Sequence, residues 1–135
     1  MQDILYGLMW VALGSVFGGI ARYFVSGLVG RRIGETFPWG TLTVNISGCL
    51  AIGLLVAAAD NQVLLHIPTY WQIAVVGFLG CYTTVSSFSL QTLMLVRDGE
   101  FLYAGGNLLL SFVLCFSAVV LGFATGTAAI AFGAP

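Results

Sequence analysis

Long apolar stretches separated by short polar links form the dominant pattern along the chain. No Lys, Arg, His, Asp or Glu occurs from Phe37 to Ala59 or from Phe101 to Pro135, and Arg22 is the only one from Ile4 to Gly30. A helix needs about 20 apolar residues to cross the hydrocarbon core of a bilayer. The pattern therefore predicts an all-α membrane protein, a single domain over residues 1–135 with four transmembrane helices. The predicted spans are residues 4–28, 39–59, 70–96 and 101–130.

The composition agrees with lipid as the solvent of this protein. Of 135 residues, 59% are hydrophobic and 7% are charged, whereas a soluble domain carries about 25% charged residues. The formal net charge of -1 gives no electrostatic footprint for nucleic acid. No pairing of a nucleophile with a base is visible, so the sequence also indicates that the chain is not an enzyme.

The links between the predicted spans hold most of the charge. Their ionisable residues are Arg31, Arg32 and Glu35 in the first link, Asp60 and His66 in the second, and Arg97, Asp98 and Glu100 in the third. If both termini lie on one side of the membrane, the three link arginines share the other side. The positive-inside rule then predicts that the termini point outward.

Small residues recur where two predicted spans can pack closely. Gly14 and Gly18 are four residues apart in the first span, and Gly122 and Gly126 repeat that spacing in the fourth. Glycines at this spacing let helix backbones approach each other where lipid supplies no hydrophobic drive. Because four helices alone form a thin bundle with little room for a water-lined path, we expect the chain to oligomerise.

Two polar side chains inside the spans require partners. Arg22 lies near the end of the first span, where it either snorkels to the interface, binds an anion or caps a helix end. Asn45 lies deeper in the second span and cannot snorkel. An amide in hydrocarbon must find a hydrogen-bond partner, in a neighbouring helix or in a permeating species.

The third span contains a stretch that suits a continuous helix poorly. Residues 77–89 hold two glycines, Gly77 and Gly80, followed by a cluster of Thr and Ser. Glycine costs backbone entropy in a helix, and Ser and Thr compete for backbone hydrogen bonds. We therefore expect the third helix to be broken near Gly80. Carbonyls freed by such a break at membrane depth suit a hard cation.

Two lines of polar residues follow the third and fourth spans. After the expected break, one helix face carries Thr84, Ser87, Phe88 and Gln91. The fourth span repeats polar residues every four positions at Asn107, Ser111 and Cys115. Either line alone is explained by hydrogen bonds between helices. Together they favour a narrow conduction path, because hydroxyl and amide donors, with the edge of a phenyl ring, can replace the hydration water of a small anion.

The chain resembles the Fluc/CrcB family of fluoride channels in three short motifs. They are Gly-x-x-x-Arg-Tyr at residues 18–23, Gly-Thr-Leu-x-Val-Asn at residues 40–45 and Thr-Thr-x-Ser-x-Phe-Ser at residues 83–89. Each motif alone is a weak signal, but their order and spacing on four closely linked spans cover nearly the whole chain. The resemblance implies a multi-pass protein of the bacterial plasma (inner) membrane that exports fluoride passively and lowers its cellular concentration.

The resemblance also implies an assembly and a set of site residues. Two subunits would form an antiparallel dimer with two fluoride pores between them. A structural sodium ion (Na+) would lie at the dimer centre, held by the backbone carbonyls of Gly80 and Thr83. The pore would be lined by Asn45, Ser87, Phe88 and Ser111, with Arg22 near its mouth. The polar lines described above add Thr84 and Asn107 to these candidates.

The chain also departs from the family pattern. Val85 stands where the family usually has the first of two phenylalanines, so Phe88 is the only ring of this motif. The chain is therefore either a conducting subunit or a non-conducting, accessory subunit of a heterodimeric channel. Its partner is either a second copy or a paired homologous subunit of opposite orientation. A small multidrug transporter is a more distant alternative, because no span contains the carboxylate that its proton exchange needs.

Overall fold

The protein is all-helical over the residues that the computed structural model describes, which are 2–34, 36–60 and 68–133. No strand occurs within these ranges, so the prediction of an all-α fold is confirmed. The helices in chain order are α1 (Gln2–Ile33), α2 (Trp39–Asp60), α3 (Pro68–Trp71), η1 (Gln72–Leu79), α4 (Gly80–Tyr82), α5 (Val85–Arg97) and α6 (Phe101–Gly133). Glu35 and His66, which the sequence places in the links, lie outside the described residues.

Four helical stretches are long and apolar enough to cross a membrane. They are Ile4–Ile33, Trp39–Ala59, Thr69–Arg97 and Phe101–Phe132. The first helix continues past the predicted end at residue 28. Its last turn carries Arg31 and Arg32, and cations favour the negative end of the helix dipole. Most large apolar side chains on these helices are exposed within the chain, as expected for surfaces that meet lipid or another subunit.

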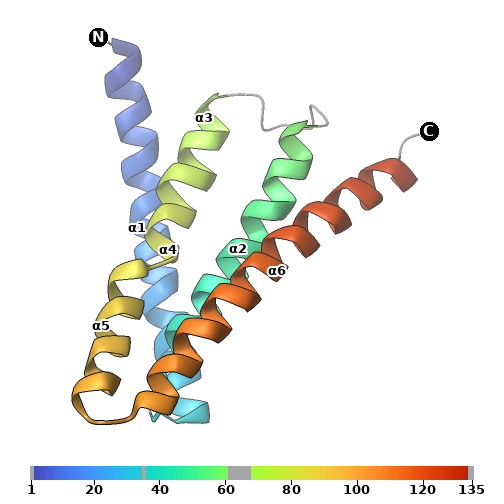
Figure 1. Ribbon diagram of the computed structural model, residues 1–135. Helices are drawn as coiled ribbons and strands as arrows, with labels where there is room; N and C mark the ends of the chain where they lie inside the picture. The colour runs from blue at the N-terminus through green and yellow to red at the C-terminus, as the bar shows by residue number, and fades with distance from the viewer. Residues whose placement is uncertain (1, 35, 61–67, 134–135) are drawn as a thin grey trace.

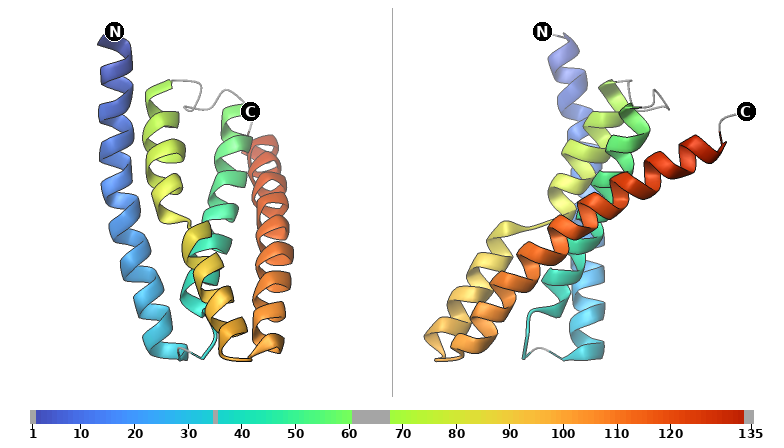
Figure 2. Two further views of the ribbon diagram at one scale, coloured as in Figure 1. Left: turned by 60° about the vertical axis from the view of Figure 1, so that its left-hand side comes forward. Right: turned by 45° about the vertical axis from the view of Figure 1, so that its right-hand side comes forward.

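Both termini lie at one end of the bundle, and the turns that follow α1 and α5 lie at the other (Figure 1). Arg31, Arg32 and Arg97 are in the last turns of these two helices, so the link arginines share one end. α1 packs mainly on η1, and α2 packs mainly on α6. Figure 2 shows that α6 crosses the bundle at an angle and that its C-terminal part leads away from the other helices.

Glycine permits the close approach of helix backbones at two of these contacts. A methyl group added to Gly14 would lie 2.9 Å from the Phe78 amide nitrogen and 3.1 Å from the Gly77 Cα. One added to Gly122 would lie 3.2 Å from the Gly53 Cα. Any side chain at these positions would force the helices apart. The close packing predicted from the spacing of small residues is therefore confirmed in the first and fourth spans.

The third span changes course between α4 and α5 (Figure 2). Thr83 has φ −80° and ψ 160°, and Thr84 has φ −152° and ψ 121°, so both residues are extended. Gly80 itself is helical, with φ −60° and ψ −34°. The chain thus leaves the helix at Thr83, after the glycine near which we expected a break. Thr84 sets this position because its hydroxyl caps α5, accepting the Ser87 N–H at 3.2 Å.

Candidate functional site

The side-chain amide of Asn45 bonds both backbone polar groups of Thr84, its N–H and its carbonyl. The Thr84 N–H donates to Asn45 Oδ1 at 2.8 Å, and Asn45 Nδ2 donates to the Thr84 carbonyl at 3.0 Å. Extended backbone inside a membrane protein has lost its helical partners and must find others. The partner that the deep amide of Asn45 requires is thus the backbone of the third span, in the neighbouring helix.

A second contact ties α2 to the residues before the extended segment. The Ser47 hydroxyl donates to the Thr43 carbonyl at 2.8 Å, so the Tyr82 hydroxyl donates to Ser47 Oγ, also at 2.8 Å. The Tyr82 ring stacks on Phe78, with 5.7 Å between ring centroids. Sequence reasoning missed this contact. The available signal was Ser47, a hydroxyl two residues after Asn45 on a helix that also packs against the third span.

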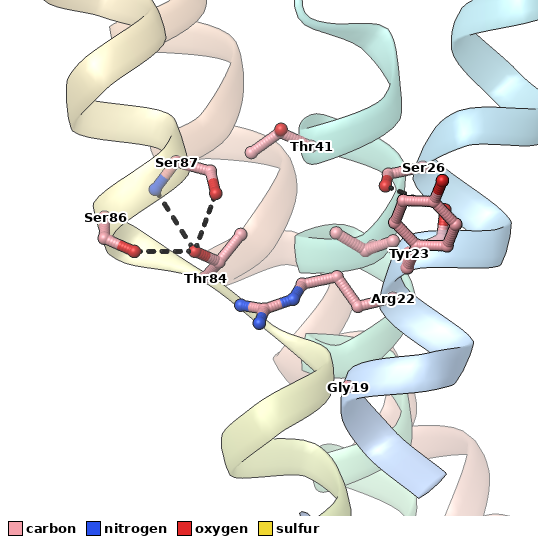
Figure 3. A pocket seen from close by; sticks show the side chains of 9 residues that line it. Gly19, Arg22, Tyr23, Ser26, Thr41, Thr84, Ser86 and Ser87 are labelled. Carbon is pink, nitrogen blue, oxygen red and sulfur yellow. Dashed lines mark hydrogen bonds between the residues drawn. The ribbon is translucent and has the colours of Figure 1, made fainter. Parts of the chain in front are cut away.

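A polar cavity of about 330 Å³ lies between α1, α2 and the start of α5. Its lining residues are Gly19, Arg22, Tyr23, Ser26, Thr41, Val44, Thr84, Ser86 and Ser87. Figure 3 shows the Arg22 guanidinium extending from α1 toward the hydroxyls at the start of α5. There, Thr84 Oγ1 lies 3.1 Å from Ser86 Oγ and 3.2 Å from Ser87 Oγ. Among these described lining residues there is one cation and no carboxylate, so the cavity offers an anion a positive charge and hydroxyl donors.

Two neighbouring cavities continue from this one toward the turn after α5. A cavity of about 400 Å³ shares Ser26, Thr41 and Ser87 with the first and adds Gln91. A further cavity of about 460 Å³ shares Gln91 with the second and is also lined by Asp98 and Glu100 in the turn. Gln91 Oε1 is buried and has no hydrogen-bond partner among the described residues. Gln91 therefore stands where the two cavities meet, with an amide oxygen free to accept a bond from water or another donor.

The structure brings together only some of the predicted pore residues. Arg22, Thr84 and Ser87 line one cavity, and Asn45 is bonded to Thr84. Phe88 and Ser111 are partly buried on α5 and α6, and neither lines the cavities described above. Asn107 is 1% exposed and donates from Nδ2 to Thr92 Oγ1 at 2.8 Å. At Asn107, the polar line predicted along the fourth span therefore faces α5 in the interior of the chain.

Gly80 and Thr83 line a separate cavity of about 230 Å³, together with residues of α2 and η1. In a continuous helix the Gly80 carbonyl would accept the Thr84 N–H, but that N–H donates to Asn45. The Thr83 carbonyl would accept the Ser87 N–H, but that N–H donates to the Thr84 hydroxyl. Across the part of the chain that is described, no group of three or more His, Cys, Asp or Glu could hold a metal. The carbonyls of Gly80 and Thr83, whose helical donors bond elsewhere, are oxygen ligands of the kind that hard cations prefer.

Four helical stretches long and apolar enough to cross a bilayer, three of which line a polar cavity that contains one arginine, define a multi-pass membrane protein. Residues 9–123 match the family model described as CrcB-like protein, Camphor Resistance (CrcB). The match covers more than half of the chain, and the protein belongs to the CrcB family.

Relatives from several bacteria are similar over most of the chain. The Fluoride-specific ion channel FluC 2 of Rhodopseudomonas palustris (strain BisB18) is 62% identical over 125 residues, which cover 92% of this chain and 95% of the relative. The Fluoride-specific ion channel FluC 2 of Bradyrhizobium diazoefficiens is 54% identical over 121 residues, or 89% of this chain and 88% of the relative. The Fluoride-specific ion channel FluC 3 of Brucella suis biovar 1 is 46% identical over 114 residues, or 84% and 86%. Relatives named as ion channels confirm that the chain is not an enzyme.

Proposed function

We propose that the chain is a subunit of a fluoride-selective channel through which fluoride leaves the cell passively. The observation that carries this proposal is the cavity at Arg22, Thr84 and Ser87, where a guanidinium and hydroxyls converge. The names of relatives up to 62% identical support fluoride as the ion. We also propose the bacterial inner membrane as the location, because a passive exit path is useful there.

The chemistry of the lining suits a small anion. Hydroxyl and guanidinium donors of the cavity can replace its hydration water, and in the proposed pore the positive edge of the Phe88 ring would add a weaker contact. No Asp, Glu, Lys or His lies within residues 4–28, 39–59, 70–96 or 101–130, so a proton relay has no group to act through. Fluoride enters cells from an acidic medium as neutral HF and dissociates in the less acidic interior, so an exit path needs no coupled energy source. Because the chain belongs to the CrcB family, nothing supports the alternative that it is a small multidrug transporter.

For assembly we propose an antiparallel pair of subunits with two pores between them. Leu109, Phe112 and Phe116 on α6 are all more than 60% exposed, so this helix offers an apolar face to a second subunit or to lipid. The link arginines at one end favour a single orientation in the membrane. A paired homologous subunit of opposite orientation is therefore a candidate partner beside a second copy. Two of the relatives are numbered FluC 2, a numbering that suits proteins with a homologous partner in the same organism.

We further propose a structural sodium ion where the third spans of the two subunits meet. Support comes from the carbonyls of Gly80 and Thr83, whose helical donors, the N–H groups of Thr84 and Ser87, are used elsewhere. Two such carbonyls from each subunit would surround one ion. Replacing sodium by a large organic cation should then lower the temperature at which the dimer dissociates. An unchanged dissociation temperature would contradict the site.

The function is tested by fluoride efflux from vesicles that contain the purified protein. We expect efflux of fluoride and retention of chloride, with protein-free vesicles as the control. A correctly inserted chain that passes no fluoride alone but does so with a paired homologous subunit would support the accessory alternative. Val85 is the reason to test that alternative. It is 77% exposed where the third span resumes its helix, and it has no ring to present to an ion. No efflux in either arrangement would overturn the proposal.

A further inference from the structure

Asn107 is the polar side chain that the fold buries most deeply among the described residues. It is 1% exposed and lies on the face of α6 that meets α5. Its Nδ2 donates to Thr92 Oγ1 at 2.8 Å, and the Thr92 hydroxyl donates to the Phe88 carbonyl at 2.7 Å. Since a hydroxyl has one hydrogen, the direction of both bonds is fixed. They form a relay that runs from α6 to the backbone of Phe88.

This relay matters because α5 is weakly packed. α5 is described over its whole length, and none of its 13 residues is buried. Its N-terminus is held by the bonds between Asn45 and Thr84, and its C-terminus by the turn into α6. Between these ends, the bond from Asn107 to Thr92 links the middle of α5 to α6. The helix held in this way carries Ser87, Phe88 and Gln91 on one face.

We infer that Asn107 is a positioning residue that holds α5, and with it Phe88, at the pore, and that it does not itself contact the permeating ion. This inference rests on the proposed function. A side chain that is 1% exposed presents almost no surface to an ion, and one of its two amide hydrogens is already donated to Thr92. The sequence prediction that placed Asn107 in the lining of the conduction path is replaced here by an indirect role. The relay sets the depth and rotation of the Phe88 ring.

Three variants test the relay. Asn107→Leu keeps a similar volume but removes the donor. Thr92→Val keeps the shape of threonine but removes the hydroxyl, and Thr92→Ser keeps the hydroxyl. We expect Asn107→Leu and Thr92→Val each to lower fluoride efflux roughly threefold to tenfold, the effect of one lost hydrogen bond. Thr92→Ser should restore efflux, and the double variant should be no worse than either single one because both act on one relay.

Hydrogen exchange of the α5 amides provides a second readout that does not need conduction. In Asn107→Leu and in Thr92→Val, the amides of residues 88–96 should exchange faster than in the unchanged protein. If the unchanged protein passes no fluoride, the proposed function fails, while faster exchange would still show that the relay holds α5. If the exchange rates are unchanged in both variants, the relay does not hold α5 and the inference is wrong.

Two further outcomes would overturn the inference. Normal efflux in Thr92→Val together with low efflux in Asn107→Leu would show that Asn107 acts without Thr92, as an ion contact would. If the variants have a lower unfolding temperature but unchanged efflux per folded channel, the bond between Asn107 and Thr92 stabilises the helix packing and does not position α5 for conduction. If Asn107→Leu does not insert, the comparison of Thr92→Val with Thr92→Ser still decides the point.

Discussion

The contact between α2 and α6 and the attachment of α5 represent two ways of holding a helix in a membrane protein. At the first contact, Gly53 and Gly122 let the two backbones meet, and a methyl group at either would lie within about 3.2 Å of the other's Cα. α5 has no buried residue and is held by side-chain hydrogen bonds from Asn45 and Asn107. Because lipid supplies no hydrophobic drive, close packing builds the frame. The polar bonds place α5, the helix that we propose to face the ion.

This difference predicts that changes at the glycine contacts cost the most stability, that changes to the polar bonds around α5 cost less, and that changes to side chains that α5 presents affect ion flow. A frame made by backbone contact tolerates no added atoms. A helix held by a few bonds tolerates substitutions but loses its position. The following four predictions test that separation, in order of decreasing effect.

Gly122→Ala should produce the largest effect. Its new methyl group would meet the Leu50 carbonyl and lie 3.1 Å from the Leu54 amide nitrogen, and backbone cannot move aside cheaply. We expect a loss of about 3 kcal/mol in the free energy of unfolding, or no folded protein. The measurement is thermal unfolding in detergent. Gly105→Ala on the same helix is the matched control, because nothing lies within 4 Å of its added methyl group. Equal stability of the two variants would contradict the role of the glycine contact.

Asn45→Leu should come next. It leaves the Thr84 N–H and carbonyl without the bonds of 2.8 and 3.0 Å that Asn45 now supplies. An unsatisfied buried group costs about 1–3 kcal/mol, and we expect a loss of that size in the free energy of unfolding. Thr127→Val is the control, since that hydroxyl bonds only carbonyls of its own helix. An unfolding temperature unchanged by Asn45→Leu would mean that water or another group replaces the amide.

The contact between α2 and α6 could be predicted from the sequence to a larger extent than the attachment of α5. The spans and the glycine contacts follow from apolar length and small-residue spacing, which are local properties. The periodicity that grouped Asn107, Ser111 and Cys115 shows which residues share a face, but not which neighbour that face meets. Periodicity thus placed Asn107 on a polar face, but it could not show that the side chain is 1% exposed and bonded to Thr92 on α5. The bonds of Asn45 to Thr84 join residues 39 positions apart, a pairing that only the packed helices define.

Phe88→Ile should separate ion flow from stability. The substitution removes the ring edge that we expect to contact fluoride, while α5 keeps its bonds to Asn45 and Asn107. We expect fluoride efflux to fall about tenfold, consistent with the loss of one aromatic contact, at an unchanged unfolding temperature. Phe24→Ile removes a ring that is 62% exposed on α1 and serves as the control in the same vesicles. Equal efflux from both variants would show that the Phe88 ring does not contact the ion.

Tyr82→Phe should produce the smallest effect, because it removes a single hydroxyl and keeps the ring stacked on Phe78. The lost bond is the 2.8 Å contact with Ser47 Oγ, which is still occupied with its own α2 carbonyls. We expect the free energy of unfolding to fall by about 0.5–1.5 kcal/mol, against no change in Tyr6→Phe, whose ring is 62% exposed.

The combination of Tyr82→Phe with Asn45→Leu sharpens this last prediction. Ser47 holds Tyr82, just before the extended segment, and Asn45 holds Thr84, the second extended residue, so both contacts fix the same short stretch to α2. If the stretch moves as one unit, the two losses should not add, because releasing either end already frees part of what the other holds. The measurement is the unfolding temperature of the two single variants and the double variant. Strict additivity would show instead that the extended segment is held independently on its two sides, and that the position of α5 depends on Asn45 alone at this end.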